Sequence, residues 1–187
     1  MGLGDADSLR GEAVVEQVRT TVERVIKILR DPNLQGEEKK AERREKLSEV
    51  ILPRFDFEKM VKCSLGNHWP RLAGRREDLV HAFASFVENS YAEKIEAYKN
   101  EKILYLGGRL TLRFTEIDTK VITSTGEGIP ISYKLRHVGG QWKVYDVLIE
   151  NVSLVEHYRS QFRRILATET FDELLERLQG RGSIIEE

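Results

Sequence analysis

Apolar residues in the first hundred positions recur at steps of three and four, the spacing of one face of an α-helix. The first run predicts a helix over residues 9–30, which the following Asp-Pro-Asn sequence ends. The charged segment GEEKKAERREKLSEVIL predicts a second helix with a thin apolar stripe, and Pro53 stops it. A short helix capped by Asp56 and closed by Gly66 follows, and the strongest pattern predicts a helix over residues 75–99.

The period changes to two from about residue 101, which indicates β-strands. The alternating segments are KILYLG, RLTLRFTEID, KVITST, IPISYKLR and QWKVYDVLIE. The sequences GEG and VGGQ between them are typical of hairpin turns, because glycine adopts positive φ without strain. These segments predict an antiparallel meander of four or five strands.

Two helices close the chain, each opened by a capping-box pattern. The first pattern joins Ser153 to Glu156, and the second joins Thr170 to Glu173. Gly180 ends the last helix. The order of helices, sheet and helices predicts an α+β fold, in which N- and C-terminal helices flank a curved antiparallel sheet of four or five strands.

The length of 187 residues suits one domain. We expect this domain to span residues 9–180. Residues 1–8 are expected to be a tail that is disordered or foreign to the natural chain, and residues 181–187 a C-terminal tail.

The overall charge gives no sign of a polyanionic partner. Thirty basic and thirty-one acidic residues leave a net charge of -1, so no global field favours nucleic acid or an anionic membrane. Cys63 is the only cysteine, which excludes an intrachain disulfide. The four histidines are scattered and no phosphate-binding loop is recognisable, so neither a metal nor a cofactor is expected.

The N-terminal sequence MGLGDADSLRGE lacks the basic-then-apolar layout of a signal peptide. No run of 18 apolar residues is present that could span a bilayer. On these grounds alone the expectation is a cytosolic protein, or a mature form whose signal peptide has been removed.

Asp146 is the sharpest polar signal. Strict alternation would place it on one face of its strand with Val144, and would place Val147 on the other. A carboxylate among apolar residues needs a partner or a raised pKa. It could be a general base in a small cone-shaped α+β enzyme, like the nuclear-transport-factor-like isomerases and dehydratases. Alternatively it is structural, bonded to Arg159 or to a helix-end amide, and the lack of a suitable histidine partner favours this second interpretation.

The aromatic stripes of the two long helices, over residues 75–99 and from residue 153, also allow two interpretations. Ordinary core packing explains most such stripes. Large, stiff aromatic side chains between a helix and a sheet can also hold open a ligand cavity.

Four segments together resemble the MlaC, or toluene-tolerance auxiliary, family. They are FDFEKM, LGNHW, FASFVENSYAEKI and GQWKVYDVLIENVSLVEHYRSQF, and the resemblance covers roughly residues 12–180. The last segment is the most specific. It departs from the family at Asn151, where a glycine is usual, and asparagine is the residue that best replaces glycine in left-handed backbone.

This resemblance implies a soluble periplasmic carrier, not an enzyme, whose signal peptide is absent from this chain. Such a carrier binds glycerophospholipid acyl chains in an apolar cavity and needs no cofactor or metal. It would dock transiently on an inner-membrane ABC transporter complex and on an outer-membrane lipoprotein complex, and is expected to be a monomer.

The resemblance assigns the residues near the C-terminal strand and helix to two roles. Asp146, Asn151, Ser153 and Arg159 become structural. The expected lipid-binding wall consists of Leu65, Trp69, Phe83, Phe86, Val87, Tyr91, Tyr105, Tyr133, Val147, Ile149, Val152, Leu154 and Tyr158.

Overall fold

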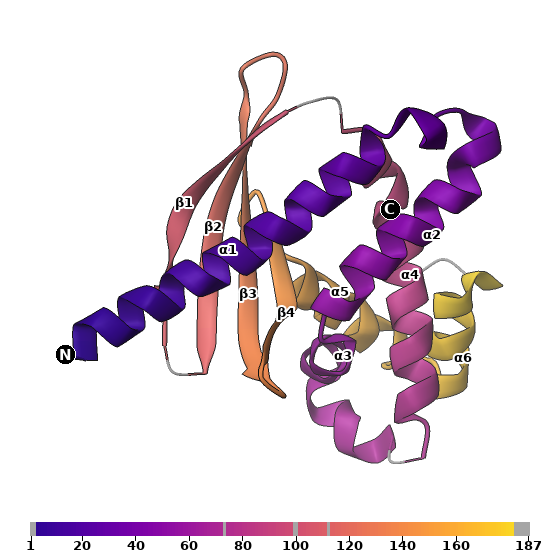
Figure 1. Cartoon of the computed structure of the whole chain (residues 1–187). Coiled ribbons are helices and arrows are strands. Elements are labelled where there is room, and N and C mark those ends of the chain that lie inside the picture. Colours follow the sequence, from indigo (N-terminus) through magenta and orange to yellow (C-terminus); the bar gives the residue numbers. More distant parts are fainter. Residues whose placement is uncertain (1–2, 73, 99–100, 112, 182–187) are drawn as a thin grey trace.

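The computed structural model describes residues 3–72, 74–98, 101–111 and 113–181, and it confirms the α+β fold (Figure 1). Helix α1 crosses one face of a five-stranded antiparallel sheet, and the other helices gather beside strand β4 (Figure 1). The helices are α1 (Leu3–Leu29), α2 (Lys40–Ile51), α3 (Phe57–Leu65), α4 (Arg76–Glu96), α5 (Leu154–Ile165) and α6 (Phe171–Glu176). The strands are β1 (Lys102–Leu110), β2 (Phe114–Ile122), β3 (Gly128–Val138), β4 (Gln141–Ile149) and β5 (Val152–Ser153).

Two of the helices, α3 and α6, begin at residues whose side chains cap the first turn. The Asp56 carboxylate accepts a hydrogen bond from the backbone amide of Lys59 at the start of α3, at 3.0 Å. The Thr170 hydroxyl and the Glu173 carboxylate form the reciprocal capping box of α6. These contacts satisfy amides that a helix leaves without an internal partner.

The sheet is a meander in the order β1-β2-β3-β4-β5. A register shift in the β3–β4 ladder pairs Lys134 with Asp146 but Leu135 with Val144, so Tyr145 is an extra residue in β4. Such a bulge bends a strand and increases its twist. Residues of β4 on either side of Tyr145 therefore do not follow strict alternation.

The core joins the helices to the face of the sheet that α1 crosses. Phe83 of α4 and Phe162 of α5 are almost fully buried, with their ring centroids 6.0 Å apart. Ile117 and Leu135 are buried on the same face of the sheet. Removing these apolar side chains from water is the main contribution to stability.

The bounds of one strand and of the first helix differ from those predicted. The segment RLTLRFTEID was predicted as one strand, but β1 ends at Leu110 and β2 begins at Phe114. Thr111 closes the turn, because its hydroxyl donates a 2.7 Å hydrogen bond to the carbonyl of Phe114. The first helix begins at Leu3 and not at residue 9. Residues 182–187 of the expected C-terminal tail lie outside the described part of the chain.

Candidate functional site

A largely apolar cavity of about 460 Å³ lies between α2, α4 and the sheet. Its apolar lining includes Leu47 and Ile51 of α2, Val87, Tyr91, Ala92 and Ile95 of α4, Ile131 and Tyr133 of β3, Val147 and Ile149 of β4, and Leu154 of α5. Phe55 and Phe57 add a stacked aromatic pair to the lining, with centroids 5.5 Å apart. A cavity of this size and polarity suits an apolar ligand.

The bulge in β4 determines which strand residues reach the cavity. Because paired residues in an antiparallel ladder share a face, Val147 lies beside Tyr133 and Ile149 beside Ile131. Val144 is beside Leu135, on that same face. The expectation that Val144 shares a face with Asp146 is therefore wrong, because the extra residue Tyr145 reverses the alternation between them.

Polar side chains of the lining come from neighbouring positions on α2 and α4. Ser48 of α2 contacts the Glu88 carboxylate of α4 through its hydroxyl. Glu45, Ser85 and Asn89 are exposed, so this part of the lining faces solvent. The site therefore combines an apolar interior with a hydrated polar rim, an arrangement that matches an amphiphile.

The tyrosines of the wall remain uncharged. Burial raises the pKa of Tyr133, although its hydrogen bond with Thr119 acts in the opposite direction. Burial also raises the pKa of Tyr91, against a hydrogen bond with Tyr158. A neutral phenol adds polarity to the wall without placing a charge against a ligand.

Asp146 lies away from the cavity, on the opposite face of the sheet. The residue is 4% exposed, and one carboxylate oxygen accepts a 2.7 Å hydrogen bond from the Ser153 hydroxyl. The other accepts a 3.1 Å bond from the backbone amide of Val155, in the first turn of α5. Lys134 of β3 supplies the nearby cation, at 3.5 Å.

Arg159, the expected ionic partner, lies elsewhere. Its guanidinium is largely exposed and approaches Glu156 at 3.5 Å. Asp146 is bonded to a helix-end amide instead, the other structural contact that the sequence allowed. Asn151 lies at φ 67, in the left-handed region, within the two-residue turn between β4 and β5.

A comparison with protein-family models matches residues 19–180 to the MlaC protein family. The chain belongs to the MlaC family. This confirms the resemblance seen in the last strand and helix.

Two individual proteins also match the sequence of this chain. The chain is 28% identical over 142 residues to the intermembrane phospholipid transport system binding protein MlaC of Haemophilus influenzae, a match that covers 71% of this chain and 65% of the relative. It is 26% identical over 85 residues to the toluene tolerance protein ttg2D of Pseudomonas putida, over 41% of this chain and 40% of that protein. The matches therefore span less than two thirds of each relative's length.

The fold of this MlaC chain is also that of a solved structure. A phospholipid-binding protein from Ralstonia solanacearum, determined in complex with a phospholipid, superposes with a TM-score of 0.76. The match covers 89% of this chain and 94% of that one, at 24% sequence identity.

The described residues of this MlaC chain show no membrane-spanning or metal-binding feature. None of their helices has the length and apolarity needed to cross a bilayer. They also contain no cluster of three or more histidine, cysteine or acidic side chains suited to a metal ion.

Six of the expected wall residues line the cavity. They are Val87, Tyr91, Tyr133, Val147, Ile149 and Leu154. They come from α4, β3, β4 and the first residue of α5, so the structure brings together positions that are far apart in the sequence.

The other seven lie outside this lining. Leu65, Trp69, Phe83 and Tyr158 are buried in the helical core. Phe86 packs edge-on to Tyr158 with centroids 5.8 Å apart, and the Tyr105 ring lies 4.8 Å below the Arg19 guanidinium of α1. Val152 of β5 is 58% exposed. The aromatic stripe of α4 is broader than the cavity, and its Phe83 and Phe86 pack against Tyr158 of α5 instead.

Sequence reasoning missed the contribution of α2 and of the segment before α3. The charge of α2 suggests a solvated helix, yet Leu47 and Ile51 line the cavity. Phe55 and Phe57 on either side of Asp56 were a usable signal, because two aromatic residues flanking a helix cap seldom both point to solvent. Ile131, two positions before Tyr133, follows from strand alternation.

Proposed function

We propose that this protein is a phospholipid carrier, which encloses the acyl region of a glycerophospholipid in the cavity and moves it between membranes. The observation that carries the proposal is the cavity itself, apolar in its depth and polar at its rim. Membership of the MlaC family and the likeness to a phospholipid-bound structure support it.

The energetics of acyl chains explain why a carrier needs such a cavity. Two chains contain about 30 methylenes, and exposing them to water would cost on the order of 20–25 kcal/mol at ~0.8 kcal/mol each. Transfer from the bilayer interior to an apolar cavity is nearly neutral by comparison. The lipid can then be carried through water and still be released.

The proposed setting is the periplasm, with transient docking on an inner-membrane ABC transporter complex and on an outer-membrane lipoprotein complex. A carrier of this kind is expected to act as a monomer and to catalyse no reaction. The position of Asp146 weighs against the enzyme alternative, because its carboxylate lies on the face of the sheet opposite the cavity and is already bonded to Ser153 and Val155.

Co-purifying lipid tests the proposal directly. The protein is purified from bacterial cells without detergent, and bound molecules are identified by native mass spectrometry and by solvent extraction. We expect glycerophospholipids whose headgroups mirror those of the host membrane. A delipidated protein that takes up no phospholipid from liposomes would contradict the proposal.

A further inference from the structure

Phe55 and Phe57 form a stacked aromatic pair in the lining of the cavity, where the connection from α2 enters α3. Their ring centroids are 5.5 Å apart, and the angle between the ring planes is 18°. We call these two residues the aromatic pair. Aromatic side chains are large and stiff, so a stacked pair presents a firm surface to a ligand.

The pairing of β3 with β4 places the aromatic pair at one end of the cavity. Two successive rungs of this ladder on the cavity face belong to the lining: Ile131–Ile149 and Tyr133–Val147. The next rung on that face, Leu135–Val144, belongs to the core, with Leu135 fully buried and Val144 6% exposed. Phe55 forms a parallel bridge to Val144. The aromatic pair therefore lies where the lining gives way to closely packed core.

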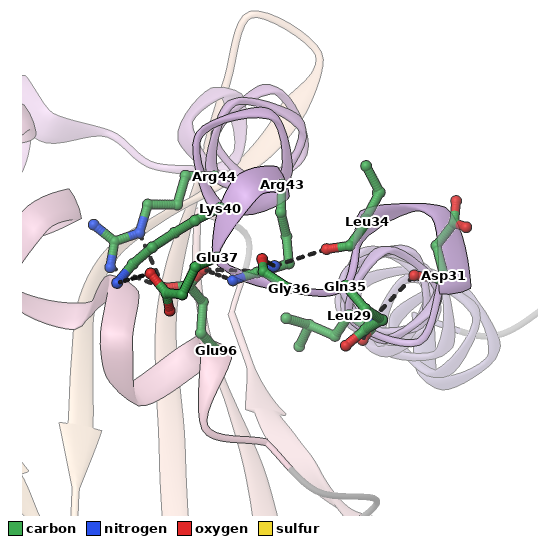
Figure 2. A network of polar contacts seen from close by, with 10 residues as sticks. All are labelled: Leu29, Asp31, Leu34, Gln35, Gly36, Glu37, Lys40, Arg43, Arg44 and Glu96. Atoms are coloured by element: carbon green, nitrogen blue, oxygen red, sulfur yellow. Dashed lines mark hydrogen bonds and ion pairs between the residues drawn. The ribbon is translucent and has the colours of Figure 1, made fainter.

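The polar part of the lining comes earlier in the chain, where α2 meets α4. Ser48 of α2 contacts Glu88 of α4. Arg44, another lining residue, pairs with Glu96 of α4, as does Arg43 (Figure 2). After Ser48, the lining residues through the start of α3 are all apolar: Ile51, Leu52, Phe55 and Phe57. An amphiphile whose headgroup lies at the polar rim would thus extend its acyl chains toward the aromatic pair.

Asp56, between the two aromatic residues, is fixed by three contacts. Its backbone amide donates a 2.8 Å hydrogen bond to the carbonyl of Val144. One carboxylate oxygen accepts a 3.0 Å bond from the amide of Lys59, and the other accepts a bond from Nε of Arg136 on β3. The Asp56 side chain is 8% exposed, so its ion pair with Arg136 is shielded from solvent. These contacts hold the backbone that carries both rings against the sheet.

We infer that the aromatic pair is the end stop of the cavity, which sets the length of acyl chain that the protein accepts, and that Arg136 positions this stop through Asp56. The inference rests on the proposed function and adds a chain-length preference to it. A methylene that finds no room before the stop has to remain at the rim, in contact with water. Each such methylene lowers the affinity about fourfold relative to a shorter lipid.

The variants Phe55→Ala and Phe57→Ala test the end stop, because each removes one ring of the aromatic pair. Delipidated protein is equilibrated with liposomes that hold equal amounts of two phosphatidylcholines differing only in acyl-chain length. The ratio of the two bound lipids is then measured by extraction and mass spectrometry. We expect each variant to shift this ratio toward the longer lipid, by about fourfold for each methylene that the missing ring admits.

Phe86→Ala is the matched control, because it also removes a ring but Phe86 packs against Tyr158 outside the lining. It should lower stability, measured by thermal denaturation, without shifting the ratio of bound lipids. If the alanine variants of the aromatic pair fold poorly, Phe55→Leu and Phe57→Leu remove less volume and should give smaller shifts in the same direction. An unshifted ratio in the folded variants, or an equal shift in Phe86→Ala, would overturn the end stop.

The variant Arg136→Gln tests the positioning role, because it removes the ion pair with Asp56 and leaves both rings in place. We expect a smaller shift of the same ratio toward the longer lipid, and exposed Arg109→Gln on the same sheet should cause none. A loss of stability with an unchanged ratio would show that Arg136 does not position the stop. Failure of the unsubstituted protein to bind either phosphatidylcholine would overturn the proposed function itself, whereas equal binding of both lipids by it would overturn only the chain-length preference.

Discussion

At the scale of single residues, the buried carboxylate of Asp146 joins the last long strand to the last long helix. It accepts hydrogen bonds from the Ser153 hydroxyl and from the Val155 amide, and Lys134 balances its charge. Ser153 in turn accepts a 3.1 Å bond from the Glu156 amide as the cap of α5. One acidic side chain thus positions the start of α5, whose first residue, Leu154, lines the cavity.

We therefore expect Asp146→Asn to lower the free energy of unfolding by about 1–3 kcal/mol, because charged hydrogen bonds in a buried site are weakened. Chemical denaturation measures the loss, and exposed Glu176→Gln serves as the control. Phospholipid transfer should decline only as far as stability declines. Unchanged stability with abolished function would instead favour the role of Asp146 as a catalytic base.

Two tyrosines of the protein interior predict how stability depends on pH. Burial, followed by the neighbouring Tyr133, raises the pKa of Tyr105 to about 12, and burial likewise raises the pKa of Tyr158. The unfolded chain loses its tyrosine protons near pH 10, before the folded protein does. Stability is therefore complete below about pH 10 and falls as the pH rises further.

Phenolate absorbance of the native protein tests this expectation. The titration should remain incomplete at pH values where the unfolded protein is fully ionised. Denaturation at increasing pH should show the parallel fall in stability. If every tyrosine titrated together near pH 10 in the native state, Tyr105 and Tyr158 would be hydrated and the expectation would fail.

At the scale of elements, the turn between β4 and β5 decides how α5 begins. Glu150 and Asn151 lie at φ 51 and 67, so both residues of this two-residue turn are left-handed. Glycine would have no steric penalty there, and asparagine has a small one. The turn returns the chain so that Ser153 pairs with Leu148 and reaches Asp146.

We expect Asn151→Ala to lower the free energy of unfolding by about 1 kcal/mol, because alanine tolerates left-handed backbone poorly. Asn151→Gly should leave stability unchanged or raise it slightly, because glycine has no steric penalty in this conformation. Thermal denaturation of the two variants gives the comparison. Equal stability of both would show that the turn relaxes to another conformation.

The wall contributed by α4 offers a direct test of the cavity. Ala92 is a small lining residue, and Ala92→Trp would place a large indole inside a volume of 460 Å³. The amount of co-purified lipid should fall by at least about half, because the indole takes up space that acyl chains need. Ala13→Trp on the exposed side of α1 is the control. Normal lipid content in folded Ala92→Trp would exclude this cavity as the binding site.

At the scale of the whole molecule, the near balance of charge means that docking depends on local patches. The segment EEKKAERREK and the corner at Arg75 and Arg76 concentrate charge in the sequence and are candidate patches. Much of their charge is already engaged, since Arg75 pairs with Asp172 and Arg76 lies 4.9 Å over the Trp69 ring. Exposed Lys46 and Glu45 remain open to solvent near the rim of the cavity.

If the protein docks on the proposed membrane complexes, we expect this docking to weaken as salt is added, because the Debye length falls from ~10 Å at 0.1 M to ~3 Å at 1 M. Binding to the reconstituted complexes at increasing ionic strength measures the effect, and sedimentation tests the expected monomer. Lipid occupancy of the isolated protein is the control and should change little. Docking that is indifferent to salt would exclude a charged interface.

Local signals in the sequence determined the elements. The spacing of apolar residues predicted helices and an antiparallel sheet, and Asp56 and Thr170 marked helix starts that the structure confirms. These features depend on neighbours within a few positions, so they can be recognised without knowledge of the fold. The string from Trp142 to Phe162 identified the family in the same way.

Only the tertiary structure decided which of these side chains face the cavity. The bulge at Tyr145 moved Val144 to the face of Val147, and this shift arises from pairing between strands that no local pattern reveals. The wide stripe of α4 was divided between core and cavity by the positions of α3, α5 and α2. The charged helix α2 became a wall of the cavity through contacts with distant segments, among them the ion pairs of Arg43 and Arg44 with Glu96, more than fifty positions away. Contacts between distant segments depend on the closed fold, and they determine the site.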